Sequence, residues 1–244
     1  MAYFNGNKDF IVLLSSGSGG SNVELDTTLT KEGCAAEAKA TGLRIEDLEQ
    51  QMADMNYKQI TASLSVSPST AEMGQSVTNA KLTWSTSKET SAITLDGVSV
   101  DGKTTHTDTN TYTANKTWTL KATEADEKGA TATATAKLTF YNGVYYGAVA
   151  EPTEYNSAFI LGLTKTLRSS KLTSFTANAG EGQYIYYCLP KSMGTCSFKV
   201  GGFDGGFSLV ATISFTNSTG NHTEDYYIYR TDNAALGSTS VAVS

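Results

Sequence analysis

The chain has 244 residues, 39% of them hydrophobic and 17% charged, and its formal net charge is -6. This acidic balance argues against binding to nucleic-acid phosphates, which requires clustered Lys and Arg. No apolar run approaches the roughly 20 residues of a membrane-spanning helix, so membrane insertion is not expected. The 36 threonines, most of them between Thr61 and Thr139, favour half-exposed strands and predict a mainly β protein.

Residues 1–30 and the segment that follows them, up to residue 58, form the most acidic part of the chain. Residues 1–58 contain nine acidic and five basic residues, a net charge of -4. Phe10 to Leu14 predicts a short strand, and the Ser- and Gly-rich stretch 15–21 predicts a flexible hinge. The apolar run is too short for the core of a secretory signal peptide.

Residues 31–58 carry a helical pattern. Apolar and small side chains recur there at spacings of three and four residues, which is a heptad pattern. These positions are Ala38, Thr41, Ile45, Leu48, Met52 and Met55. So narrow a stripe buries little by itself, which leaves two interpretations: a helix lying on a sheet, or a short parallel coiled coil that joins copies of the chain. We predict the second, a homotrimer.

Residues 59–141 predict an immunoglobulin-like sandwich. About seven short alternating segments occur here, with an Asp96-Gly97 turn and a second turn at 127–129. The cysteine pair of antibody domains is absent, so the core must rest on apolar packing. The expected core residues are Leu82, Trp84, Leu95, Trp118, Leu120 and Leu138.

Residues 142–244 predict a second β-sandwich or a jelly roll. Asn142-Gly143 reads as a turn before a first strand. Further strands are expected at 158–163, 172–176, 183–189, 196–200, 208–216, 226–230 and 239–243. Ten of the 13 tyrosines follow residue 140. Alternation along a strand predicts that Tyr184 and Tyr186 face one side of the sheet and Tyr187 the other.

No constellation of catalytic residues stands out. The two histidines, His106 and His222, lie in polar stretches that predict solvated turns, and neither is in a nucleophile motif. No Cys/His or EF-hand spacing is present, so we expect no metal and no cofactor, and we predict that the protein is not an enzyme. Carboxylates distant in sequence remain open as a catalytic pair. Candidates are Glu181, Asp204, Glu224 and Asp225.

Two features of the C-terminal region allow two interpretations each. Cys188 and Cys196 flank a predicted hairpin, where a disulfide is geometrically feasible, but reduced and partly buried thiols are favoured. The glycine-rich stretch 201–206 lacks the lysine of a nucleotide-binding loop and predicts a flexible connection. Phe203 within it either folds into the core or contacts a ligand from the loop tip.

Four stretches resemble virion structural proteins of tailed bacteriophages and prophages of Gram-positive gut bacteria. They are residues 3–15 (YFNGNKDFIVLLS), 28–42 (TLTKEGCAAEAKATG), 120–133, with LKAT and EKGATAT, and 140–147 (FYNGVYYG). Proteins of this kind are fibre, baseplate or decoration components, often trimeric, with immunoglobulin-like modules. The resemblance supplies no catalytic residues.

The resemblance implies a location and a set of partners. We expect a protein of the virion, made in the host cytoplasm and released by lysis, with residues 1–30 bound to other virion proteins. Its β-domains would attach to the host surface, with carbohydrate as the expected ligand. The alternative is a purely structural head fibre or decoration protein without a ligand.

Overall fold

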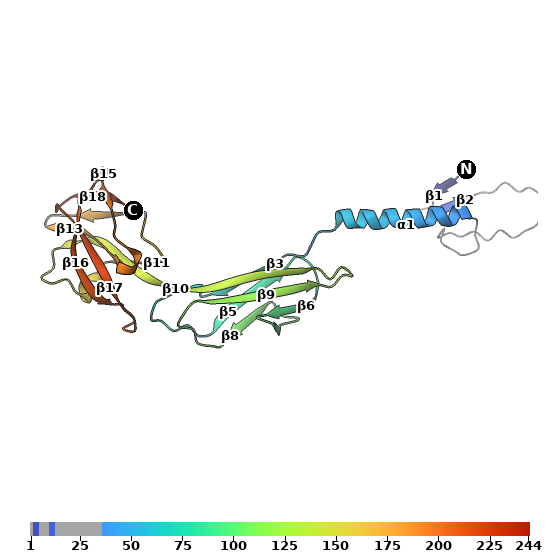
Figure 1. Cartoon of the computed structure of the whole chain (residues 1–244), viewed down its shortest axis with the longest axis horizontal. Helices are drawn as coiled ribbons and strands as arrows, with labels where there is room; N and C mark the ends of the chain where they lie inside the picture. Colours follow the sequence, from blue (N-terminus) through green and yellow to red (C-terminus); the bar gives the residue numbers. More distant parts are fainter. Residues whose placement is uncertain (1, 5–9, 13–35) are drawn as a thin grey trace, which may run out of the picture. The chain divides into compact units, whose positions relative to one another are not determined.

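The computed structural model describes residues 2–4, 10–12 and 36–244, with side chains from residue 42 onward. Contacts divide the chain into two compact units, residues 1–59 and 60–244, the second of which contains both β-domains (Figure 1). The described residues are mainly β, as the composition predicts.

The first unit contains a strand pair and one long helix. β1 (Ala2–Phe4) pairs antiparallel with β2 (Phe10–Val12), which confirms the short predicted strand. The helix α1 spans Ala36–Asn56, inside the predicted range. The predicted hinge at 15–21 and the side chains of Ala38 and Thr41 lie outside the described residues.

The middle domain is an immunoglobulin-like sandwich of two sheets, as predicted. One sheet has the order β3-β5-β8, from β3 (Ala62–Ser67), β5 (Ala80–Thr86) and β8 (Thr105–Asp108). The other has the order β7-β6-β9-β10, from β6 (Thr90–Leu95), β7 (Val98–Ser99), β9 (Lys116–Glu124) and β10 (Thr131–Ala150). The short β4 (Thr70–Glu72) crosses over from β3 and pairs parallel with β10.

The core of this domain lies between the two sheets and contains all six apolar residues predicted for it. The four of them in β5 and β9 follow a strict alternation, in which every second residue points inward. The Asp96-Gly97 turn also forms as predicted, with positive φ at both residues. His106 lies in β8 and not in a turn, and it pairs with Leu82 of β5.

The C-terminal domain consists of a second pair of sheets. The larger continues from the middle domain in the order β16-β17-β13-β10, with β11 also paired to β10. It is formed by β11 (Thr164–Arg168), β13 (Gln183–Pro190), β16 (Phe207–Thr216) and β17 (Thr223–Thr231). The smaller has the order β12-β18-β14-β15, from β12 (Ser174–Ala179), β14 (Phe198–Val200), β15 (Phe203–Asp204) and β18 (Gly237–Val243).

The larger sheet is buried on both faces. One face packs against the smaller sheet, and the other is covered by the short helix α2 (Ser157–Leu161) through Ile160. Tyr184 and Tyr186 belong to the α2 side and Tyr187 to the side of the smaller sheet, which confirms the predicted alternation. Burial on both faces explains why β13 is an almost continuous apolar run.

The strand predicted at 158–163 is wrong, because α2 and the turn after it occupy this stretch. A run of a few apolar residues has no periodicity that separates a short strand from a buried helix. The local chemistry favours the helix: the side chain of Asn156 accepts a hydrogen bond from the backbone N–H of Phe159 at 3.0 Å, as an N-cap does.

The predicted Asn142-Gly143 turn is also wrong, because both residues lie within β10. Gly143 is needed there for close packing, since a Cβ at this position would lie 2.6 Å from Cε2 of Tyr145. Its carbonyl oxygen accepts a hydrogen bond from the Tyr226 hydroxyl at 2.7 Å. Gly143 is therefore a packing residue inside the sheet and not part of a turn.

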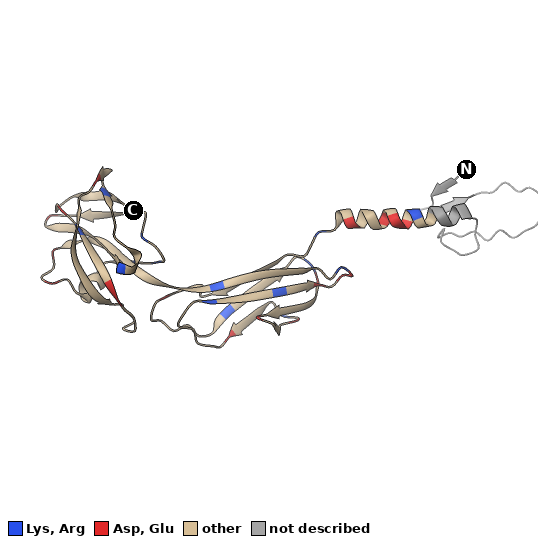
Figure 2. Ribbon diagram, in the orientation of Figure 1, with Lys and Arg blue, Asp and Glu red and all other residues tan. Residues whose placement is uncertain are grey.

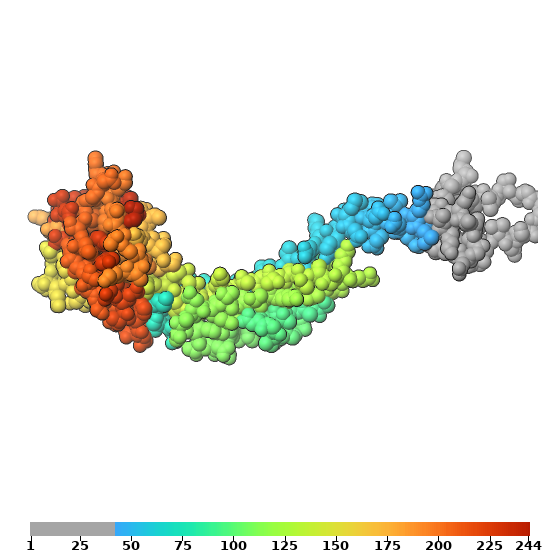
Figure 3. Space-filling view, in the orientation of Figure 1, coloured from blue at the N-terminus to red at the C-terminus, as the bar shows by residue number. Residues whose placement is uncertain are grey.

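β10 links the two domains as one uninterrupted strand (Figure 1). Its first half, residues 131–138, pairs with β9, and its second half pairs with β11 and β13. The predicted domain boundary at 141/142 falls inside this strand. In the space-filling view the surface of residues 60–141 continues without a break into that of residues 142–244 (Figure 3).

Candidate functional site

The stripe predicted for the trimer lies exposed along α1. Ile45 is 44% exposed, Leu48 and Met52 are each 57% exposed, and Met55 is 78% exposed. Every side chain of the helix from Leu43 to Asn56 is exposed. Figure 2 shows acidic residues along the same helix.

Phe203 lies at the tip of a tight hairpin. β14 and β15 are joined by Gly201 and Gly202, both with positive φ, which L side chains rarely adopt. The expected flexible connection is therefore a two-residue β-turn. Phe203 is 81% exposed, which excludes the interpretation that it folds into its own core. Lys199 and Asp204 form an ion pair across the hairpin at 3.1 Å.

The two described cysteines are free thiols. Cys188 faces the α2 side of the larger sheet, whereas Cys196 packs on the opposite side, so no hairpin joins them. β13 and β14 belong to different sheets, which corrects the hairpin prediction and confirms the preferred reduced state. Burial raises the pKa of the Cys196 thiol to about 11 and raises that of Cys188 further, so neither is a ready nucleophile.

A loop of the C-terminal domain, residues 217–222, is docked on the middle domain. The Asn217 side chain donates to the carbonyl oxygen of Met73 at 2.6 Å, and Asn221 donates to that of Gly74 at 3.4 Å. A Cβ on Gly74 would lie 2.6 Å from the Thr219 hydroxyl oxygen. We call residues 217–222 the clamp loop.

His222 lies in the loop between β16 and β17, as predicted, but its side chain is only partly solvated. Its side chain is 30% exposed, and its Nε2 lies 3.5 Å from a carboxylate oxygen of Glu224. The same carboxylate accepts hydrogen bonds from Asn142 and Ser192. Glu224 is thus an acceptor that holds three segments together, which is a structural role.

An ion pair between the buried Glu72 and the exposed Lys165 reinforces the contact between the domains. Glu72 of β4 is 3% exposed, and its Oε2 accepts hydrogen bonds from the Lys165 ammonium at 2.8 Å and from the Ser218 hydroxyl at 3.1 Å. The hydroxyl of Tyr145 is also buried, and its pKa is raised by burial and by the negative charge of Glu72. The clamp loop and this pair fix β4 of the middle domain against β11 of the C-terminal domain.

The carboxylates considered for catalysis are not brought together as a pair. Glu181 lies in a turn, Asp204 lies in the Phe203 hairpin, and Glu224 and Asp225 are neighbours in β17. Asp225 is exposed and lies 3.9 Å from the Lys191 ammonium. Among residues 2–4, 10–12 and 36–244, no group of three His, Cys, Asp or Glu is arranged to hold a metal ion. Within the same residues, no helix is long and apolar enough to cross a membrane.

Sequence reasoning missed the junction between the domains. Glu72, Lys165 and Asn217 come from three distant stretches, and each is an ordinary polar residue in its own context. The only local signals were Asn142-Gly143, which was interpreted as a turn, and the Gly-Asn-His stretch, which was interpreted as a solvated loop.

Comparison with known proteins identifies no family for the chain. No protein-family model and no curated protein matches the chain. The crystal structure of the N-terminal eight Ig domains of Down Syndrome Cell Adhesion Molecule, isoform 1.30.30, is similar at 8% sequence identity with a TM-score of 0.22. The match covers 73% of this chain but only 26% of that chain. A likeness this low carries no argument about function.

Proposed function

We propose that the protein is a component of a tailed-phage virion that projects two β-domains from the particle and attaches to the host surface. Residues 1–30 bind other virion proteins, the helix joins copies of the chain, and the β-domains contact a surface carbohydrate. The proposal is supported by the resemblance of four sequence stretches to phage structural proteins and by the immunoglobulin-like module. It assigns no catalytic activity to the protein.

The observation that carries the proposal is the exposed stripe on α1. An isolated helix in water is marginally stable, and most helices in proteins are stabilised by packing of an apolar face. α1 has 21 residues and leaves Ile45, Leu48 and Met52 exposed. Other copies of the same helix would cover these side chains at the heptad spacing of the sequence.

We expect the full chain to sediment as a trimer at tens of micromolar. The double variant Ile45→Asp/Met52→Asp should sediment as a monomer, because charges at seam positions are costly to bury in a coiled coil. Ala53→Asp is the matched control, since Ala53 is exposed and lies outside the predicted seam. Analytical ultracentrifugation makes the measurement, and a monomeric wild-type chain would contradict the prediction.

The location is tested on intact particles. An antibody raised against residues 60–244 should label virions in electron micrographs at one kind of appendage, at the tail, the baseplate or the head. Absence of label on particles that lyse the host normally would refute the virion assignment.

For Phe203 we expect a loss of attachment without a loss of stability. Phe203→Ala should reduce binding of the full chain to Gram-positive cell-wall polysaccharide, because an exposed aromatic ring on a rigid hairpin is a low-entropy contact. Its free energy of unfolding should change by less than about 0.5 kcal/mol, as is usual at exposed sites. Leu209→Ala, also exposed in this domain, is the control. Unchanged binding would remove Phe203 from the contact surface.

A second candidate function is that of a structural spacer without a ligand. The observation that favours it is the contact between the domains through the clamp loop and the Glu72–Lys165 pair, because a spacer needs domains that are fixed to each other. Binding of the wild-type chain to host cells or to their polysaccharide separates the two functions, since a spacer binds neither.

A further inference from the structure

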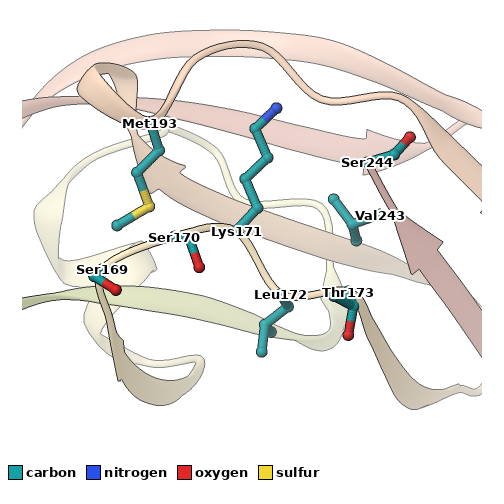
Figure 4. Close-up of a pocket in the computed structure, with 8 residues that line it drawn as sticks. All are labelled: Ser169, Ser170, Lys171, Leu172, Thr173, Met193, Val243 and Ser244. Carbon is teal, nitrogen blue, oxygen red and sulfur yellow. The ribbon is translucent and has the colours of Figure 1, made fainter.

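Two neighbouring pockets lie beside the segment that joins β11 to β12 and against the short helix η1 (Lys191–Met193), and both include Ser169 and Met193. We call them together the junction groove. The first, of about 300 Å³, is formed by both domains, including Asn115, Thr139 and Tyr141 of the middle domain and Arg168 and Ser192 of the C-terminal domain. The second, of about 380 Å³, lies within the C-terminal domain (Figure 4).

The walls of the groove are held in place before any ligand arrives. β10 lines the first pocket, where residues 139–141 are fixed by pairing with β4 and Asn142 by pairing with β11. The Glu72–Lys165 pair and the clamp loop hold the two domains together beside it. Clefts between domains with a few fixed polar groups are common positions for small-molecule sites.

Arg168 is positioned to receive an anion. Its Nε and Nη2 donate to the carbonyl oxygens of Ser170 and Lys171 at 3.5 and 3.4 Å, which orients the guanidinium. Within the described residues no hydrogen bond is assigned to Nη1, so this edge can donate to a ligand. A planar guanidinium with a fixed orientation is suited to a carboxylate or a phosphate oxygen.

The charged side chains that line the groove are basic. The lining residues, all in the described part of the chain, include Arg168 and Lys171 but no Asp or Glu. The Lys171 ammonium is held by the carbonyl oxygen of Thr195. Glu224 is not among the lining residues, and its carboxylate accepts hydrogen bonds from Asn142 and Ser192, which are. This arrangement is notable in a protein with 24 acidic and 18 basic residues.

The remaining lining chemistry fits a sugar. Hydroxyl groups of Thr139, Tyr141 and Ser169 and the Asn115 amide can hydrogen-bond to sugar hydroxyls, and Met193 offers an apolar surface to ring C–H groups. Each pocket is at the lower end of the roughly 300–1,000 Å³ of ligand sites, which suits one sugar ring. We propose that the junction groove binds an acidic saccharide, with its carboxylate or phosphate on Arg168. This inference rests on the proposed attachment function and names its ligand class.

Isothermal titration of the full chain with defined saccharides tests the proposal. The probes are trigalacturonate, which carries carboxylates, glucose 6-phosphate, which carries a phosphate, and the neutral partners maltotriose and glucose. We expect at least one acidic probe to bind at least tenfold more tightly than its neutral partner, and the one that does identifies the acidic group. Equal affinities within both pairs, or no binding of either acidic probe, would overturn the proposal.

Two variants locate the site. Asn115→Asp places a negative charge in the groove, while its side-chain oxygen can still accept a hydrogen bond from the N–H of Phe140. We expect this variant to lower the affinity for the acidic probe at least tenfold. Arg168→Gln should do the same. The controls are Asn178→Asp and Arg44→Gln, at exposed positions outside the groove. Their affinities for the acidic probe should stay within twofold of wild type. Wild-type affinity in Asn115→Asp at an unchanged melting temperature would overturn the assignment.

The two proposals fail in different ways. If the groove is not the site, wild-type protein binds cell-wall polysaccharide and Asn115→Asp binds it equally well. If the attachment function is wrong, the wild-type chain itself binds no polysaccharide, whereas its affinity for the acidic probe and the effect of Asn115→Asp still report on the groove.

Discussion

Replacing Asp108 with Ala should lower the free energy of unfolding of the β-domains by about 3 kcal/mol, because it leaves buried donors without an acceptor. Asp108 accepts hydrogen bonds from the Trp118 indole N–H at 2.8 Å, from the Tyr112 hydroxyl at 2.7 Å and from Asn110 at 2.8 and 3.0 Å. Trp118 is 1% exposed at the centre of the sandwich, so its N–H cannot turn to water. Urea denaturation followed by tryptophan fluorescence measures the loss.

The same network gives a pH dependence with a defined sign. Burial acts to raise the pKa of Asp108, but the hydrogen bonds from Tyr112, Trp118 and Asn110 outweigh it and hold the pKa below its ordinary value. The stabilisation is therefore present above the unfolded-state pKa of about 3.9 and is lost as the pH falls through the lower folded-state value.

Asp108→Asn serves as the variant for this pH test. The stability difference between wild type and Asp108→Asn should shrink as the pH is lowered from 6 to about 3. Asp225→Ala, at an exposed carboxylate, should change stability by less than about 0.5 kcal/mol and is the control. A difference that is constant with pH would contradict the assigned role of the Asp108 charge.

Gly143→Ala should destabilise the β-domains by about 3 kcal/mol, at the upper end of the range for overpacked cores. The new methyl group would lie 2.6–2.8 Å from ring atoms of Tyr145, which is itself 1% exposed and cannot move aside. Gly147→Ala in the same strand is the matched control, because its Cβ would make an ordinary contact of 3.5 Å with Leu163. Thermal or urea unfolding of the three proteins makes the comparison.

A double-mutant cycle tests the stated cause. Tyr145→Leu removes the ring and is costly by itself, but in its background Gly143→Ala should cost little, since the clash has gone. Equal costs of Gly143→Ala in both backgrounds would mean that strain elsewhere in β10 is responsible.

The sequence was informative wherever a pattern repeated along one element. The alternation of Leu82 and Trp84 in β5, and of Tyr186 and Tyr187 in β13, predicted which side chains share a face. The Asp96-Gly97 turn was predictable because a two-residue hairpin needs positive φ at both positions. The heptad spacing predicted α1, whereas the association of α1 with other copies of itself remains a prediction.

The errors arose where a residue's role is set by a contact distant in sequence. Asn142-Gly143 is a typical turn sequence, but here Gly143 lies inside a sheet. Its missing side chain leaves room for the Tyr145 ring, and its carbonyl oxygen accepts a hydrogen bond from the Tyr226 hydroxyl. Ser157–Leu161 form a helix because Asn156 caps it and because it covers one face of the larger sheet. The junction groove could not be predicted, because Asn115 and Arg168 carry no motif and are combined only by the fold.

The shared strand β10 also determines how the β-domains would respond to tension. Force applied between residue 60 and the C-terminal domain enters the sandwich through β3 and β4 and leaves through β10. β4 and β10 are parallel, with Thr70 opposite Thr139 and Glu72 opposite Tyr141, so the two strands are pulled along their length in opposite directions. Their backbone hydrogen bonds are then loaded together in shear and not opened one after another, and the Lys165–Glu72 pair lies at the end of this ladder. The β-domains would therefore lengthen little under load until the β4–β10 hydrogen bonds broke together.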